Sequence, residues 1–146
     1  MRLYPPAPLN LPHESIEDCI VGGYDVPIGM HLLTNILKLQ RDHLLYSDSL
    51  EFRLERFFTT HKDVDIKGQN FELIPFDTGR RMCHGISFGL KLIQITFATL
   101  SHGLNIVAPN GELVDMVEES GLTNIKASPL KMIFTPRIST QVYSKN

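Results

Sequence analysis

The stretch that decides the fold is FDTGRRMCHG at residues 76–85, together with ISFGLKLIQITFATLS at residues 86–101. In the second segment apolar residues recur every three or four positions, and only a narrow polar stripe interrupts them. This spacing predicts one long helix over residues 86–101, largely buried and ending near Gly103. The first segment then becomes a glycine-containing loop that presents a single cysteine just before a helix.

The cysteine of this loop, Cys83, has surroundings that favour a thiolate. The free N–H groups at a helix start and the two neighbouring cations, Arg80 and Arg81, all stabilise negative charge. Gly79 and Gly85 carry no side chain, so a flat ligand can approach the backbone closely. A thiolate with an open face suits a metal ligand, and a haem iron bound by thiolate receives electron density that favours O–O cleavage. The plain alternative is that Cys83 is a small buried hydrophobic residue, as most lone cysteines are.

Length and composition exclude several classes of protein. The chain has 146 residues, about one domain, and 42% of them are hydrophobic. Its 14 Lys+Arg and 16 Asp+Glu give a net charge of −2, which excludes a strongly basic nucleic-acid binder and an acidic disordered tail. The two cysteines form neither a disulfide scaffold nor a zinc pattern, and Cys19 is interpreted as structural. No transmembrane segment or secretory signal is predicted, because no apolar run reaches the roughly 18 residues of a membrane span.

Outside the long helix the predicted elements are short. They are a hairpin over residues 19–35 with its turn at 27–29 and second strand at 31–36, one helical turn at 42–47, an irregular segment at 51–82 and a strand at 130–135. By itself the chain therefore reads as an α+β domain with one long helix at 86–101.

The cysteine loop resembles the haem-binding loop of the cytochrome P-450 haem-thiolate monooxygenases. It matches the spacing F-x-x-G-x-R-x-C-x-G at Phe76, Gly79, Arg81, Cys83 and Gly85. Five identities in ten residues rarely arise by chance when each costs roughly a factor of 20.

Other segments extend the resemblance along the chain. Residues 52–57, FRLERF, look like the F-x-P-E-R-F segment of the family. Residues 2–6, RLYPP, look like the end of its E-x-x-R helix and the proline-containing segment after that helix. Three stretches are most similar in sequence to plant A-type members, of the eighty-two family: LYPPAPLNLPHES at residues 3–15, GGYDVP at 22–27 and ESGLTNIKASPL at 119–130.

This resemblance implies a mainly α fold with small β-sheets, of which residues 1–146 would be the C-terminal haem-binding region. The N-terminal membrane anchor, the oxygen-activation helix and the glutamate of E-x-x-R would lie outside this chain. The implied cofactor is haem b (iron protoporphyrin IX). The implied partners are an NADPH–cytochrome P-450 reductase, O2 and a small apolar plant secondary metabolite that is hydroxylated. Intact relatives would sit on the cytosolic face of the endoplasmic reticulum membrane, and a chain without the anchor would be cytoplasmic or of unknown location.

Site roles are implied by the resemblance position by position. The haem-contacting set would be Cys83 as the axial iron ligand, Arg81 and His13 as propionate partners, Phe76 as a shield for the sulfur, and Gly79 and Gly85 as the glycines of the loop. No catalytic residue is assigned. Residues 5–12 and 119–127 match substrate-recognition segments.

A second set would be structural. Arg2 and Arg56 match two members of the Glu-Arg-Arg cluster, and Glu55 precedes Arg56 in the same segment.

The chain departs from the family pattern at several positions. Asp77 stands where glycine is usual and brings a carboxylate close to an anionic porphyrin edge, so that Arg80 or Arg81 would have to compensate it. At three further positions, His84, Leu54 and His43, the chain lacks a proline that the family pattern has, and Ile28 stands in place of lysine.

Three functional interpretations remain open from the sequence. The first is a fragment of a haem-thiolate monooxygenase. The second is a truncated or pseudogene product without catalytic activity. The third is a small domain with a redox-active cysteine at position 83.

Overall fold

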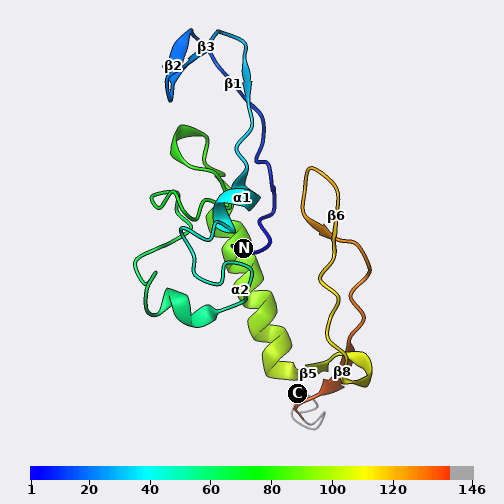
Figure 1. Cartoon of the computed structure of the whole chain (residues 1–146). Coiled ribbons are helices and arrows are strands. Elements are labelled where there is room, and N and C mark those ends of the chain that lie inside the picture. Colours follow the sequence, from blue (N-terminus) through cyan, green and yellow to red (C-terminus); the bar gives the residue numbers. More distant parts are fainter. Residues whose placement is uncertain (139–146) are drawn as a thin grey trace. The chain divides into compact units, whose positions relative to one another are not determined.

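The computed structural model describes residues 1–138, and Figure 1 labels some of its helices and strands. The chain divides into two compact units. The first comprises residues 1–83 and 120–124, and the second comprises residues 84–119 and the residues from 125 onward.

The first unit contains short strands, one short α-helix and two 3-10 helices. They are β1 (His13–Glu14), β2 (Cys19–Val21), β3 (Tyr24–Val26), β4 (His31–Leu32), α1 (Ile36–Gln40), η1 (Leu54–Phe57) and η2 (Gly79–Arg81). β1 pairs with β4 and β2 pairs with β3, both antiparallel. The rest of residues 51–82 consists of turns and irregular backbone, as the sequence predicts.

The predicted turn at residues 27–29 forms, with the Met30 N–H donating to the Pro27 carbonyl at 3.2 Å, but it does not join the paired strands of the hairpin. The chain reverses instead at Gly22 and Gly23, whose φ angles of 58° and 85° are both positive. Two successive positive φ angles give a tight turn whose twist matches that of the flanking strands, so β3 returns directly along β2. The predicted second strand, residues 31–36, shortens to β4 and pairs with β1.

The predicted helical turn at residues 42–47 forms as a single turn, in which the Tyr46 N–H donates to the Asp42 carbonyl at 2.9 Å. An α-helix that was not predicted, α1, precedes it. The side-chain Oδ1 of Asn35 accepts a hydrogen bond from the Lys38 N–H at 2.8 Å and so caps the first turn. Residues 1–4, which look like the end of a helix, are not helical.

Every buried residue of the described chain lies in the first unit. The apolar members are Pro5, Ile36, Tyr46, Leu73, Ile74 and Pro75, with Gly68 also buried. The polar members are Arg2, Asn10, Gln40 and Arg56. The core that supports the cysteine loop is therefore small and unusually polar.

The second unit is built around the long helix. Its elements are α2 (Ile86–Gly103), β5 (Leu104–Val107), η3 (Pro109–Gly111), β6 (Glu118–Glu119), β7 (Ile125–Lys126) and β8 (Ile133–Pro136). β5 pairs with β8 and β6 with β7, all antiparallel. The predictions of a long helix ending near Gly103 and of a strand near residues 130–135 are confirmed, the strand lying slightly later at β8.

The predicted burial of α2 is wrong for the chain as it stands. None of its residues is buried, and Phe88 and Phe97 are 75% and 67% exposed. Helical spacing identifies which side chains share a face, whereas burial needs a second surface to cover that face. No helix in residues 1–138 is long and apolar enough to cross a membrane.

Candidate functional site

The cysteine loop is closed by backbone hydrogen bonds within the first unit. The Cys83 N–H donates to the Phe76 carbonyl at 3.0 Å, which joins the two ends of the loop. Inside it the Met82 N–H donates to the Gly79 carbonyl at 3.3 Å across η2. The loop thus has a defined backbone that fixes where the cysteine stands.

The loop rests on Gly68, a buried glycine that the sequence analysis did not single out. Its φ is +76°, and a Cβ there would lie 3.1 Å from the Met82 sulfur and 3.2 Å from the Asp77 carbonyl oxygen. The Thr78 hydroxyl donates to the Gly68 carbonyl at 2.5 Å. A side chain at position 68 would therefore displace the loop, and only the positive φ and the close approach reveal this requirement.

The face of the loop is open to a flat ligand. Cys83 is an exposed free cysteine, and a Cβ added at Gly79 would meet nothing within 4 Å. Arg80 and Arg81 are exposed and form no hydrogen bond or ion pair with residues 1–138. An accessible sulfur, an uncovered backbone and two unpaired guanidinium groups fit a planar group that carries a metal and carboxylates.

Two further predicted site residues flank this loop. Phe76 is half-buried at its start. Gly85 lies in the second unit as the N-cap of α2, where its carbonyl accepts from the Gly89 N–H at 2.9 Å.

His13, on β1, is brought to the loop by a contact with Asp77. Its Nε2 lies 2.9 Å from Asp77 Oδ2, and the two side chains are 30% and 17% exposed. The carboxylate expected to need compensation from Arg80 or Arg81 is therefore paired with His13 instead.

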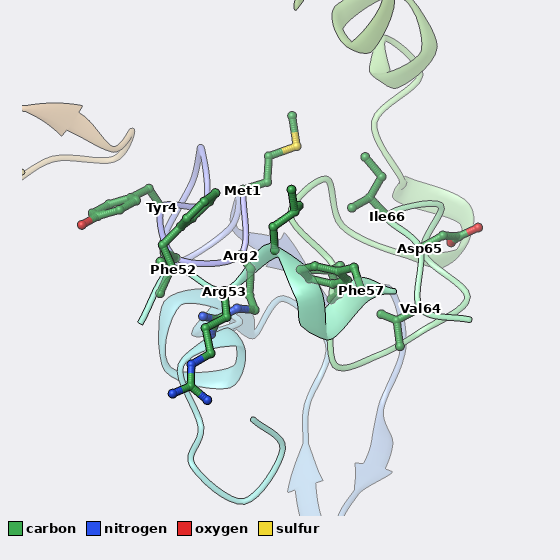
Figure 2. Close-up of a pocket in the computed structure, with 12 residues that line it drawn as sticks. Met1, Arg2, Tyr4, Phe52, Arg53, Phe57, Val64, Asp65 and Ile66 are labelled. Atoms are coloured by element: carbon green, nitrogen blue, oxygen red, sulfur yellow. The ribbon is translucent and has the colours of Figure 1, made fainter. Parts of the chain in front are cut away.

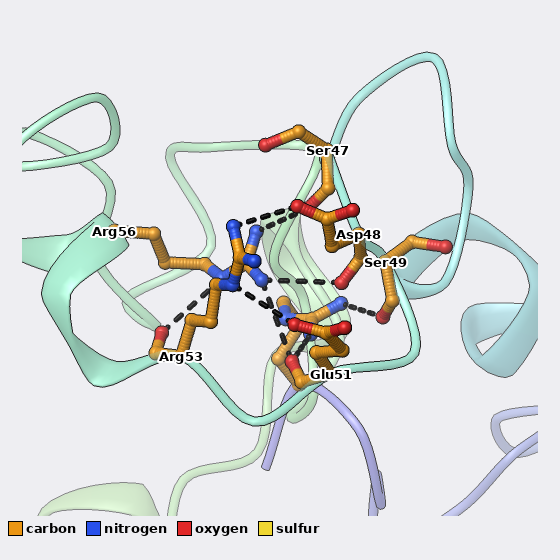
Figure 3. A network of polar contacts seen from close by, with 7 residues as sticks. Ser47, Asp48, Ser49, Glu51, Arg53 and Arg56 are labelled. Atoms are coloured by element: carbon orange, nitrogen blue, oxygen red, sulfur yellow. Dashed lines mark hydrogen bonds and ion pairs between the residues drawn. The ribbon is translucent and has the colours of Figure 1, made fainter.

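The two predicted structural arginines bind the backbone of one turn, residues 47–51, and Figure 3 shows Arg56 beside this turn. Arg2 donates to the carbonyls of Gln40 at 2.8 Å, Ser49 at 2.7 Å and Glu51 at 3.1 Å. Arg56 reaches the same Glu51 carbonyl at 3.4 Å. Burial, and after it the charge of Arg56, lowers the pKa of the Arg2 guanidinium.

The third predicted member of this set, Glu55, lies apart from it. Its side chain is exposed and forms no ion pair with Arg56 in the described chain. Its backbone carbonyl instead accepts hydrogen bonds from the Phe58 N–H at 2.9 Å and the Thr59 hydroxyl at 2.9 Å.

Tyr46 packs against both arginines, a placement that the sequence analysis missed. The Arg2 and Arg56 guanidinium carbons lie 4.8 Å and 5.9 Å from its ring centroid, and the His61 ring stacks on it at 4.8 Å. Its hydroxyl donates to the Glu72 carbonyl at 3.1 Å. Burial, and after it the Glu72 carboxylate, raises the pKa of Tyr46 to about 12. The neutral phenol and the ring face therefore help to hold the buried cations.

The predicted substrate-recognition segment at residues 5–12 lies in the first unit together with residues 120–124, the middle of the predicted segment 119–127. The Asn124 N–H donates to the Pro6 carbonyl at 2.9 Å, which joins backbones far apart in the sequence.

The first unit also holds an apolar cavity of about 490 Å³, shown in Figure 2. The rings of Phe52 and Phe57 and the aliphatic side chains of Val64 and Ile66 lie around it. Cys83 does not line this cavity, so it is separate from the cysteine loop. Within residues 1–138, no group of three or more His, Cys, Asp or Glu side chains is placed to hold a metal ion.

Comparison with known proteins relates the chain to one family. The sequence model described as Cytochrome P450 matches residues 1–133. Cytochrome P450 82A2 of Glycine max is 49% identical over 143 residues, which is 98% of this chain and 27% of that protein. Flavonoid-6-hydroxylase of Ocimum basilicum is 48% identical over 145 residues, 99% of this chain and 27% of that protein. Nicotine N-demethylase CYP82E3 of Nicotiana tomentosiformis is 46% identical over 143 residues, again 98% and 27%. The chain thus spans about a quarter of the length of these curated relatives.

Solved structures show the same fold. A zebra fish cytochrome P450 with progesterone matches with a TM-score of 0.79 at 24% identity, covering 94% of this chain and 29% of that one. The heme domain of cytochrome P450DA matches with a TM-score of 0.75 at 19% identity, with the same coverage.

Proposed function

The chain belongs to the cytochrome P450 family, and from that premise we propose that it is the C-terminal haem-binding region of a plant haem-thiolate monooxygenase. The predicted relation to the plant eighty-two family is confirmed by relatives of the 82A and 82E groups. Because the chain spans about a quarter of their length, the reaction is proposed for the whole protein.

The observation that carries the proposal is the exposed, free Cys83 on a loop with an open glycine and two arginines that have no hydrogen-bond or ion-pair partner within residues 1–138. When bound, haem b would supply the activation of O2 with electrons from a reductase. In this assignment Cys83 holds the iron through its thiolate, and Arg81 binds a haem carboxylate, for which a planar guanidinium is well suited. Phe76 would shield the sulfur and so tune the reduction potential of the iron.

The partners and substrate are part of the same proposal. The electron donor would be an NADPH–cytochrome P-450 reductase, with the intact protein at the cytosolic face of the endoplasmic reticulum membrane. The substrate class would be a small apolar plant secondary metabolite, in keeping with relatives named as a flavonoid hydroxylase and nicotine demethylases. Residues 5–12 and 119–127 would contribute to its recognition, supported by the hydrogen bond that joins them.

The test is the absorption spectrum of the full-length gene product, supplied with haem, reduced and treated with CO. We expect the red-shifted Soret band that a thiolate ligand produces, and we expect Cys83→Ser to abolish it. Cys19→Ser is the matched control, because Cys19 is also an exposed free cysteine and lies in the same unit. A band that survives Cys83→Ser, or that the unaltered protein lacks, would overturn the assignment.

A further inference from the structure

The carboxylate of Asp77 is fully engaged inside the cysteine loop. One oxygen, Oδ2, lies 2.9 Å from His13 Nε2, and the other, Oδ1, accepts from the Thr78 N–H at 2.7 Å. His13 and Asp77 are 64 positions apart in the chain, so the contact ties β1 to the loop. Both side chains are mostly shielded from water, which strengthens the interaction relative to a surface pair.

The backbone conformation at Asp77 is less favourable for aspartate than for the glycine that is usual at this position. Its φ is +68°, in the left-handed region that favours glycine, although aspartate is among the residues that tolerate it. Arg80 and Arg81 lie in the same loop, but within residues 1–138 neither forms an ion pair with the Asp77 carboxylate, which pairs with His13. The loop therefore contains one anion whose partner is the histidine of β1.

A haem also presents carboxylates, and they would compete with Asp77 for His13. A neutral imidazole donates from one nitrogen only, and here the nitrogen beside Asp77 is Nε2. A haem carboxylate at that nitrogen would meet the like charge of Asp77 at short range, which is repulsive. The exposed guanidinium groups of Arg80 and Arg81 bind no carboxylate of residues 1–138, so no such repulsion opposes a haem carboxylate there.

We propose that Asp77 occupies, in the haem-free chain, the place at His13 that a haem carboxylate would otherwise take. The His13–Asp77 pair then acts as an internal latch, which holds the cysteine loop before haem arrives and weakens haem binding because the pair has to open. This inference rests on the proposed function, since it concerns the same site.

The first experiment is a titration of the 146-residue chain with haem, followed by Soret absorbance. Asp77→Asn keeps the shape and the tolerance of a left-handed φ but removes the charge, so we expect haem to bind about tenfold more tightly. His13→Gln alone should change the affinity by less than about twofold, because His13 is already occupied. When His13→Gln is combined with Asp77→Asn, we expect it to remove most of the increase in haem affinity that Asp77→Asn produces. Weaker or unchanged binding after Asp77→Asn would overturn the inference.

The second experiment measures hydrogen exchange at the Thr78 and Cys83 amides without haem. Opening the latch by Asp77→Asn should speed exchange at both. Asp48→Asn is the matched control, because Asp48 also has a positive φ, 48°, but pairs at an exposed site with Arg53. Unchanged exchange after Asp77→Asn would overturn the latch.

The outcomes separate this inference from the proposed function. Haem binding that Asp77→Asn does not tighten would overturn the inference alone. Binding that appears only after Asp77→Asn would support it strongly. No haem binding by either 146-residue chain would overturn the inference, whereas the proposed function is decided separately by the spectrum of the full-length gene product.

Discussion

Arg2 and Arg56 are buried cations that bind backbone carbonyls rather than carboxylates within residues 1–138. A buried guanidinium is tolerated only where its donors are satisfied, because desolvation of the charge is costly. Arg56 donates to the carbonyls of Ser47 at 2.9 Å, Asp48 at 3.3 Å and Arg53 at 3.2 Å. These bonds hold the turn after Tyr46 in one conformation.

Replacing the buried arginine should cost far more than replacing its exposed neighbour. We expect Arg56→Met to destabilise the first unit by about 2–4 kcal/mol, since it leaves several backbone carbonyls without a donor. Arg53→Met should cost about 0–1 kcal/mol, because Arg53 is 49% exposed and forms surface ion pairs with Asp48 and Glu51. Hydrogen exchange at the buried Leu73 amide measures both effects. Equal losses in the two variants would contradict this account.

The raised pKa of Tyr46 predicts a loss of stability at high pH. In the unfolded chain the phenol has its ordinary pKa of 10.0, and in the folded chain about 12, so folding favours the neutral form. The stability that Tyr46 contributes is therefore fully present below pH 10 and is lost as the pH rises toward 12. Urea unfolding of the chain and of Tyr46→Phe measures it as the difference in unfolding free energy. That difference should shrink between these two pH values, and a constant difference would argue against a buried phenol.

Glycine serves opposite purposes in two elements. Gly23, in the turn between β2 and β3, has a φ of +85°, whereas Gly89 lies inside α2 with helical geometry. A Cβ added at either position meets nothing within 4 Å, so the backbone conformation alone decides the effect of a side chain.

Alanine at these two positions should therefore act with opposite signs. We expect Gly89→Ala to stabilise α2 by about 0.5–1 kcal/mol, because a helical glycine loses more entropy on folding than alanine. Gly23→Ala should destabilise the hairpin by about 1 kcal/mol, because its φ is unfavourable for an L-residue. Hydrogen exchange across the 86–103 and 19–26 segments reports each effect, and changes of the same sign would disprove the backbone argument.

Across the whole molecule, the buried residues and the exposed apolar residues are unevenly distributed. The first unit contains every buried residue of the described chain, while α2 in the second unit carries large apolar side chains in water. The fold match covers 94% of this chain but 29% of the zebra fish structure. Apolar faces of this extent are typical of surfaces that other polypeptide covers.

The family and the order of its segments could be predicted from sequence because each signal is local. The loop at residues 76–85, the FRLERF segment at 52–57 and the helix at 86–103 all depend on spacing within a short stretch. The turn at Gly22–Gly23 also had a local signal, two adjacent glycines, but the prediction gave more weight to residues 27–29. Burial of α2 could not be read from its own pattern, because burial depends on what packs against it.

By itself, then, the sequence determined the kind of loop that carries Cys83 and the long helix after it. Only the tertiary structure decided that Asp77 pairs with His13 rather than with Arg80 or Arg81, and that the Tyr46 ring packs against two buried arginines. The physical reason is distance along the chain. Backbone preferences and helical periodicity act over a few residues, whereas these contacts join residues that only folding brings within hydrogen-bonding or ring-contact range.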